Sequence, residues 1–156
     1  NTIGYDFVDV DRRIESKTGK SVSEIFFESG ESHFRSLERE LLAELASIPR
    51  LVISLGGGTP VDPLTFRFLI SSGILVYLKT TAEQIYKRLH FKNDRPMLTD
   101  VAGQRLGEEQ LRERIQTLFL VREPIYAKAD ITIHTDGKKV GITVDEIVRR
   151  LSSIIE

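Results

Sequence analysis

The sequence contains the run Leu51-Val52-Ile53-Ser54-Leu55-Gly56-Gly57-Gly58, in which an apolar segment ends in three consecutive glycines. An apolar run of this length predicts a buried strand of a parallel sheet over Leu51 to Leu55. Three glycines directly after a strand permit positive φ and let backbone N–H groups approach a ligand closely. A plain structural turn needs one glycine and rarely three, so the pattern favours a ligand-binding loop over the alternative of a turn.

The rest of the chain alternates short apolar runs with longer amphipathic segments, which is typical of an α/β domain with a parallel sheet. Three further runs predict strands: Asp6 to Val10, Ile74 to Leu78 and Ile131 to His134. Capping-box spacing predicts the starts of two helices, at Ser21 with Glu24 and at Thr80 with Glu83. Apolar residues at helical spacing predict three more, Glu31 to Leu45, Glu108 to Ala127 and Val144 to Ile155.

Size and composition are those of one ordinary globular domain, residues 1–156. The chain is 40% hydrophobic and 29% charged with a net charge of -1, so no global field attracts nucleic acid or an anionic membrane. The absence of Cys excludes a disulfide scaffold, a thiolate metal site and a Cys nucleophile. No apolar run approaches the roughly 20 residues of a membrane span and no signal peptide is recognised, so we expect a cytoplasmic protein.

Two carboxylates, Asp9 and Asp11, flank Val10 at the end of the first predicted strand. The period of two predicts that they share one face of the strand, or lie on the loop just beyond its carboxyl end. Ligands bind at that edge of open α/β sheets. One carboxylate near a metal and one on a substrate hydroxyl would suit this place. The alternative is a polar strand exit in which Asp11 caps the helix around Ile14.

Three arginines stand in patterns that are ambiguous when each is taken singly. Arg35 and Glu38 lie one helical turn apart, a spacing more common for a solvated ion pair than for a site. Arg122 lies near the end of a predicted helix, where an arginine can simply complement the helix dipole. Arg95 lies in the polar stretch Phe91 to Gly107, whose length predicts a functional lid or a disordered insert.

Taken together and in order, these motifs resemble the shikimate kinase family. The matching segments are Asp9-Val10-Asp11, Gly30-Glu31-Ser32-His33-Phe34-Arg35-Ser36-Leu37-Glu38, Gly56-Gly57-Gly58, Arg95-Pro96-Met97-Leu98 and Arg122-Glu123-Pro124-Ile125-Tyr126. The resemblance runs from about Gly4 to the C-terminus. It implies a P-loop kinase fold of the nucleoside monophosphate kinase type, with helices flanking a parallel sheet. It also implies ATP-dependent phosphorylation of the 3-hydroxyl of shikimate, in the chorismate route to aromatic amino acids.

For the acceptor, the resemblance implies a site formed by a subdomain at about residues 11–45 together with the glycine loop. Asp11 would hold ring hydroxyls of shikimate and help to orient or deprotonate the attacking one. Arg35 and Arg122 would bind the carboxylate, for which paired guanidinium groups are chemically suited. Gly57 and Gly58 would offer backbone N–H groups to the substrate.

For the nucleotide, the resemblance implies that Arg88 stacks on adenine, with residues after Asp136 as the other wall. Asp9 would support Mg²⁺ through water. Arg95, on a lid at about residues 91–107, would close over the transferring phosphoryl group and offset its developing charge. The expected ligands are shikimate, ATP and Mg²⁺, bound by a monomer, and neither nucleic acid nor a membrane is an expected partner.

One family motif is missing from these residues, namely Gly-x-x-x-x-Gly-Lys-Ser/Thr after a first, central strand. The stretch 18–21 ends like this motif, but Ile14 stands where its first glycine belongs, so we interpret it as part of an ordinary helix–loop–helix. Asn1 to Gly4 resembles the end of a helix with Gly4 as C-cap, so we expect the missing segment to precede it. Without that strand its two neighbours would face each other across a gap with unpaired backbone groups, so either the fold has closed up, another segment fills the slot, or the segment is absent from this sequence. We expect the last of these, and we expect residues 1–156 alone to be inactive.

Three functions agree with these observations. The first is a shikimate kinase whose P-loop segment is absent from this sequence. The second is a non-catalytic binding or regulatory protein of the same family that has lost ATP binding. The third is a related small-molecule kinase, such as one for gluconate, and the combination of Arg35 and Arg122 with Asp11 argues against it.

Overall fold

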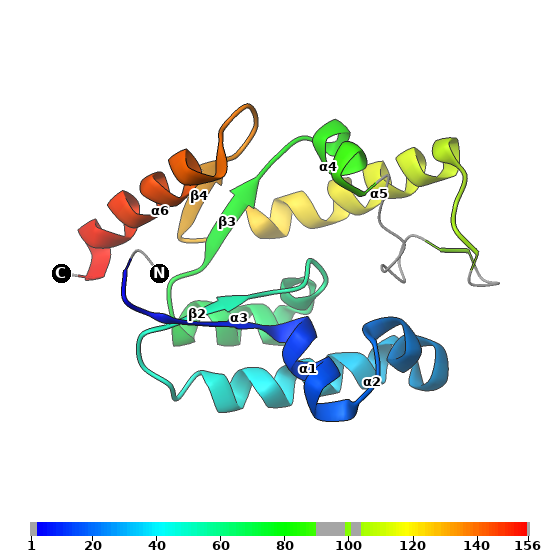
Figure 1. Ribbon diagram of the computed structural model, residues 1–156, viewed down its shortest axis with the longest axis horizontal. Coiled ribbons are helices and arrows are strands. Elements are labelled where there is room, and N and C mark those ends of the chain that lie inside the picture. The colour runs from blue at the N-terminus through cyan, green and yellow to red at the C-terminus, as the bar shows by residue number, and fades with distance from the viewer. Residues whose placement is uncertain (1–2, 90–98, 101–103, 156) are drawn as a thin grey trace. The chain divides into compact units, whose positions relative to one another are not determined.

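The computed structural model describes residues 3–89, 99–100 and 104–155 (Figure 1). The described residues form two compact units, one mainly of residues 3–68 and one mainly of residues 69–89 and 106–155. Arg95 and most of the predicted lid lie outside the described residues. The described part of the lid contains a short antiparallel bridge between Thr99 and Arg105.

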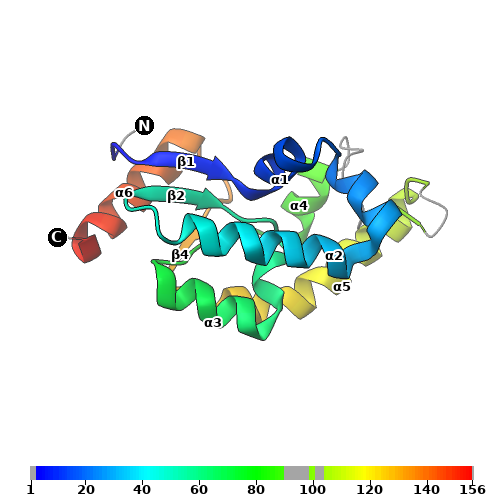
Figure 2. The same ribbon diagram turned by 90° about the horizontal axis from the view of Figure 1, so that it is seen from below.

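The first unit is built on two parallel strands, β1 (Asp6–Asp9) and β2 (Leu51–Ser54). Figure 2 shows them side by side, with α1 (Val10–Thr18) continuing from the end of β1. The unit also contains α2 (Val22–Leu45) and the 3-10 helix η1 (Thr59–Val61), and the chain passes to the second unit within α3 (Pro63–Ser72). The apolar core of the unit comes mainly from α1 and α2 and includes Val10, Ile14, Ile25, Phe34, Leu41, Leu42 and Leu45.

The first strand ends one residue earlier than predicted, because the helix begins at Val10. Asp9 is the N-cap, and its side chain accepts a hydrogen bond of 3.1 Å from the backbone N–H of Arg12. The prediction of a shared strand face for the two carboxylates is therefore wrong, as is the alternative that Asp11 is the cap. Asp11 lies just beyond the strand, in the first turn of α1, where a carboxylate complements the helix dipole.

The capping box predicted at Ser21 and Glu24 is present. The Ser21 backbone N–H donates to Glu24 Oε2 at 2.6 Å, and the Glu24 N–H donates to Ser21 Oγ at 3.2 Å. Just before it, Gly19 ends α1 with φ 69°, and Lys20 is ion-paired with Glu28. The interpretation of this stretch as a helix–loop–helix, and not as a phosphate loop, is confirmed.

A kink at Gly30, with φ 79° and ψ 170°, divides α2 into two parts. Only glycine adopts this conformation readily, because a Cβ would be strained at such a positive φ. The second part is the helix that the sequence predicts from Glu31 to Leu45. The kink sets the direction of this helix, which carries Arg35 and Glu38.

The second unit contains the parallel strands β3 (Val76–Lys79) and β4 (Ile131–His134), with Val76 opposite Ile131. Its helices are α4 (Ala82–Leu89), α5 (Glu108–Tyr126) and α6 (Val140–Ile155). β4 matches its predicted range. β3 begins and ends later than predicted, α5 ends one residue earlier, and α6 begins four residues earlier than the predicted Val144.

The predicted cap at Thr80 is wrong by one residue. The Thr81 hydroxyl accepts a hydrogen bond of 3.3 Å from the backbone N–H of Gln84, at the start of α4. Thr80 instead donates its hydroxyl to the carboxylate of Asp136, which follows β4. Two adjacent threonines offer the same local signal, and the contact with a residue distant in sequence decides between them.

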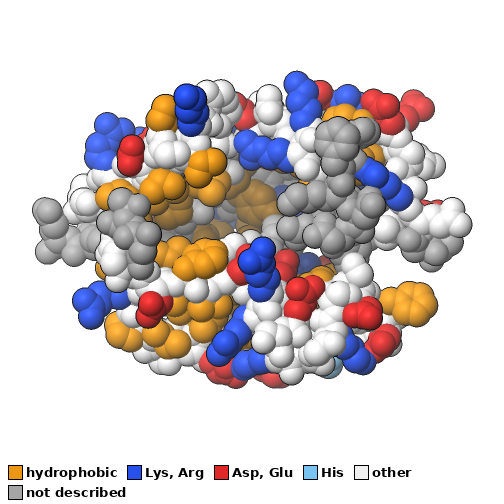
Figure 3. All heavy atoms as spheres, viewed as in Figure 1, with side chains coloured by type: hydrophobic (Ala, Val, Ile, Leu, Met, Phe, Trp, Pro, Cys, Tyr) orange, Lys and Arg blue, Asp and Glu red, His pale blue; other side chains and the backbone are white. Residues whose placement is uncertain are grey.

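The described strands form two separate sheets, β1-β2 and β3-β4. Both pairs are parallel and the helices alternate with the strands along the chain, so the α/β class is confirmed. Parallel sheets are normally covered on both faces, yet the register partners Phe7 and Val52 are 66% and 40% exposed, and Leu78 of β3 is 50% exposed. Figure 3 shows hydrophobic side chains at the surface of one face of the molecule. No helix among the described residues has the length and apolar character needed to cross a membrane.

Candidate acceptor-binding site

The glycine loop after β2 packs directly against Arg35 of α2. A Cβ built on Gly58 would lie 2.0 Å from Nη2 and 2.7 Å from Cζ of the Arg35 guanidinium. Contacts this short cannot exist, so a side chain at this position would have to displace the guanidinium. The sequence needs glycine at position 58 for close approach, because Gly58 itself has φ -83° and requires no unusual backbone.

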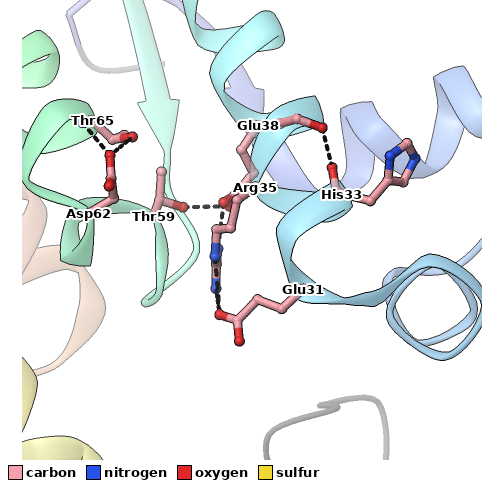
Figure 4. A network of polar contacts seen from close by, with 8 residues as sticks. Glu31, His33, Arg35, Glu38, Thr59, Asp62 and Thr65 are labelled. Atoms are coloured by element: carbon pink, nitrogen blue, oxygen red, sulfur yellow. Dashed lines mark hydrogen bonds and ion pairs between the residues drawn. The ribbon is translucent and has the colours of Figure 1, made fainter.

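Two carboxylates hold the Arg35 guanidinium in place (Figure 4). Nη1 donates to Glu38 Oε2, while Nε and Nη2 donate to Glu31 Oε1 at 3.3 and 3.1 Å. The Glu38 side chain is 2% exposed and that of Arg35 is 18% exposed. The alternative of a solvated surface pair, which the spacing alone favoured, is therefore wrong, because the Glu38 carboxylate is buried and the Arg35 side chain is largely covered.

The pKa of Arg35 reflects this environment. Burial works to lower the pKa of the guanidinium, since it disfavours the charged form, but the carboxylates of Glu38 and Glu31 outweigh it and raise the pKa. The arginine is thus kept charged and in one orientation. Both features suit the recognition of a carboxylate.

The other oxygen of Glu38 accepts a hydrogen bond from Thr59, the first residue after the glycines. The distance from Thr59 Oγ1 to Glu38 Oε1 is 2.6 Å, and both residues are 1% exposed. The Glu38 carboxylate therefore joins α2 to the loop. Sequence reasoning assigned no role to Thr59, because the two partners are 21 positions apart and no local pattern reveals their contact. The only local signal was a hydroxyl directly after the glycines.

Asp11 reaches the same loop from α1. A Cβ built on Gly56 would lie 3.3 Å from Asp11 Oδ1, 3.4 Å from Thr59 Oγ1 and 3.6 Å from Glu38 Oε1. The structure thus brings together Asp11, Arg35 and the glycine loop with Gly57 and Gly58, as the resemblance implied. It adds the buried carboxylate of Glu38 at their centre.

The other predicted site residues lie elsewhere. Arg122 is half-buried in the last turns of α5, and Arg88 is exposed in the last turn of α4, so both belong to the second unit. Arg95 lies outside the described residues. Asp9 caps α1. The described residues contain no group of three or more His, Asp or Glu that could hold a metal ion.

Glu123, next to Arg122, is held by the strand β3. Its carboxylate accepts from the Tyr77 hydroxyl and pairs with Lys79, and the Tyr77 ring packs on Tyr126 with ring centroids 5.2 Å apart. Burial acts to raise the pKa of Glu123, but Lys79 and Tyr77 outweigh it and lower the pKa. Burial and the Glu123 carboxylate together raise the pKa of Tyr77 far above its ordinary value. These contacts fix the end of α5, on which Arg122 lies.

Comparison with known proteins gives one consistent result. The family model described as shikimate kinase matches residues 1–152. Shikimate kinase of Chlorobaculum tepidum is 43% identical over 151 residues, covering 97% of this chain and 79% of the relative. That of Chlorobium limicola is 44% identical over 151 residues, covering 97% and 76%.

Solved structures agree with these sequence relatives. Shikimate kinase from Acinetobacter baumannii in complex with shikimate matches with a TM-score of 0.86 and 31% identity, covering 99% of this chain and 83% of that one. Shikimate kinase from Bacteroides thetaiotaomicron matches with a TM-score of 0.83 and 30% identity, covering 99% and 85%. The fold is therefore that of the P-loop kinases, and the chain belongs to the shikimate kinase family.

Proposed function

We propose that this protein transfers the γ-phosphoryl group of ATP to the 3-hydroxyl of shikimate. The observation that supports this most directly is that Arg35 is packed against Gly58 and oriented by Glu38, on the same glycine loop that Asp11 approaches at Gly56. An oriented guanidinium next to a carboxylate and a glycine loop suits a small molecule that carries both a carboxylate and hydroxyl groups. The related structure with shikimate bound fits the same ligand class.

In this proposal, Arg35 and Arg122 bind the shikimate carboxylate, and the backbone N–H groups of Gly57 and Gly58 bind the ring substituents. Asp11 orients the 3-hydroxyl and accepts its proton as the oxygen attacks the γ-phosphorus. A new P–O bond forms, the bond from the γ-phosphorus to the β–γ bridging oxygen breaks, and ADP leaves with that oxygen. Holding the reactants in line is the main catalytic contribution of such a site.

On the nucleotide side, Arg88 would stack on adenine and Arg95 would offset charge on the transferring group. Asp9 fits an outer position for Mg²⁺, because its Oδ1 is used by the helix cap and Oδ2 can accept from a metal-bound water. When bound with ATP, the ion would neutralise phosphate charge. A monomeric state and a cytoplasmic location remain predictions.

A direct assay tests the proposal. The natural full-length protein is incubated with ATP, Mg²⁺ and shikimate, and the products are followed by ³¹P NMR. Formation of ADP and a phosphate monoester of shikimate is expected, with gluconate inert as the control acceptor. Residues 1–156 alone are expected to turn over neither acceptor, since they contain no phosphate loop. Failure of the full-length protein to phosphorylate shikimate, or an equal rate with gluconate, would contradict the proposal.

A further inference from the structure

We propose that Thr59 is a positioning residue for the acceptor site, which acts through Glu38 on Arg35. This inference rests on the function proposed above. The Thr59 hydroxyl donates to one oxygen of the Glu38 carboxylate, and the other oxygen accepts from Arg35. Figure 4 shows this chain of contacts running from the loop to the guanidinium.

Thr59 can affect Arg35 because the Glu38 carboxylate between them is buried. Glu38 and Thr59 are each 1% exposed, so water cannot readily replace the hydroxyl if it is removed. The carboxylate would then have one oxygen without a donor in a desolvated place, which is costly. The expected response is rotation of the Glu38 carboxylate toward other donors. That rotation would weaken its contact with Nη1 of Arg35.

Thr59 is also rigidly connected to the glycine loop. Its own N–H donates to the carbonyl of Gly56 at 3.1 Å, and the N–H of Val61 donates to the carbonyl of Gly58 at 3.2 Å. Gly58 in turn packs on the Arg35 guanidinium. Thr59 therefore joins the loop to the carboxylate that holds the arginine, and the loop and the arginine are the two parts that would contact the acceptor.

The first unit offers a matched control. Thr65 donates its hydroxyl to Asp62 Oδ2 at 2.9 Å, in a contact that is also shown in Figure 4. It too is a buried threonine, 5% exposed, bonded to a carboxylate. In the part of the chain that the structure describes, no hydrogen bond or ion pair joins Asp62 to Arg35. Thr65→Val thus removes the same kind of hydrogen bond and reports its general structural cost.

The experiment compares Thr59→Val, Thr59→Ser and Thr65→Val in the natural full-length protein. Calorimetry gives the Kd for shikimate and for ATP, kinetics give KM and kcat, and thermal unfolding gives Tm. Thr59→Val is expected to raise the shikimate Kd and KM about three- to tenfold, with kcat and the ATP Kd nearly unchanged. Thr59→Ser should restore binding, and Thr65→Val should lower Tm without changing the shikimate Kd. A Thr59→Val protein that binds shikimate like the wild type, or a Thr65→Val protein with the same loss, overturns the inference.

A readout without substrate separates this inference from the proposed function. The side-chain Nε–H signal of Arg35 is recorded by ¹⁵N NMR in the ligand-free proteins. A shifted or broadened signal in Thr59→Val, restored in Thr59→Ser, supports the positioning role even if the wild type proves not to bind shikimate. A signal unchanged from wild type overturns it. If the wild type neither binds nor phosphorylates shikimate, the proposed function is overturned, but this inference is not.

Discussion

The two arginines expected to bind the acceptor carboxylate differ in their surroundings. In the first unit, Arg35 is enclosed by the carboxylates of Glu31 and Glu38, so the arginine is oriented and its charge is compensated. In the second unit, the carboxylate of Glu123 pairs with Lys79 and accepts a hydrogen bond from Tyr77, and not from Arg122. Arg122 itself forms no hydrogen bond or ion pair with the residues that the structure describes.

From this difference we expect a division of labour in the proposed binding of the acceptor carboxylate. Arg35 would supply geometry, because its guanidinium is already held against Gly58 before any ligand arrives. Arg122 would supply charge, because it forms no ion pair with a carboxylate among the described residues. A carboxylate ligand needs both, since preorganisation lowers the entropic cost of binding and an uncompensated cation provides the attraction.

The largest expected effect follows from Arg122→Ala. Losing a charge-assisted contact costs about 1.5–3 kcal/mol, so the shikimate Kd should rise roughly tenfold to over a hundredfold, with the ATP Kd little changed. Calorimetry with both ligands measures this. Arg122→Lys is the control, and it should retain most of the binding if charge is the contribution of Arg122. Equal losses for both ligands would remove Arg122 from the acceptor site.

A lysine at position 35 should behave differently. One ammonium group cannot contact Glu38, Glu31 and a substrate carboxylate in the geometry of a guanidinium fork. Arg35→Lys is therefore expected to raise the shikimate KM about tenfold, a larger loss than that of Arg122→Lys, with a smaller change in kcat. Steady-state kinetics on both lysine variants decide the point. An equal rise of the shikimate KM in the two variants would contradict the expected difference between the two arginines.

The carboxylate of Glu123 should affect stability at low pH. Its pKa is lowered from the ordinary value of 4.5 in the folded protein, so its stabilising contribution is present above that value and is lost as the pH falls below it. Glu123→Gln should cost about 1 kcal/mol at pH 7 and flatten the loss of stability below pH 4.5. Urea unfolding at several pH values tests this. The same acid slope in wild type and variant would show that the contact with Lys79 and Tyr77 is weak.

The smallest expected effect has the opposite sign. Glu31 is an exposed partner, with 54% of its side chain accessible, and it occupies the Nε and Nη2 edge of Arg35 that a ligand could use. Exposed ion pairs are worth about 0.2–1 kcal/mol, so Glu31→Gln should tighten shikimate binding by up to about fivefold. Titration of the variant at two salt concentrations measures the change. Weaker binding would mean that Glu31 supports Arg35 more than it competes with the ligand.

Local patterns in the sequence were sufficient for much of the fold. The four strands, the capping box at Ser21 and the helix from Glu31 depend on neighbours within a few residues, and they formed close to their predicted places. The order of the motifs identified the family. The boundaries were less certain: Asp9 displaced Asp11 as cap and Thr81 displaced Thr80, because adjacent candidates have nearly equal local preferences.

The sequence by itself determined the family and the α/β class, and it supplied the residues that are proposed for the site. Only the tertiary structure decided which polar groups are buried together. Glu38 and Thr59 look like surface residues in the sequence, and they are buried together at the centre of the proposed acceptor site because α2 packs beside the loop that follows β2. Burial depends on residues distant along the chain, so no local spacing rule could reveal that this carboxylate is shared between a threonine and an arginine.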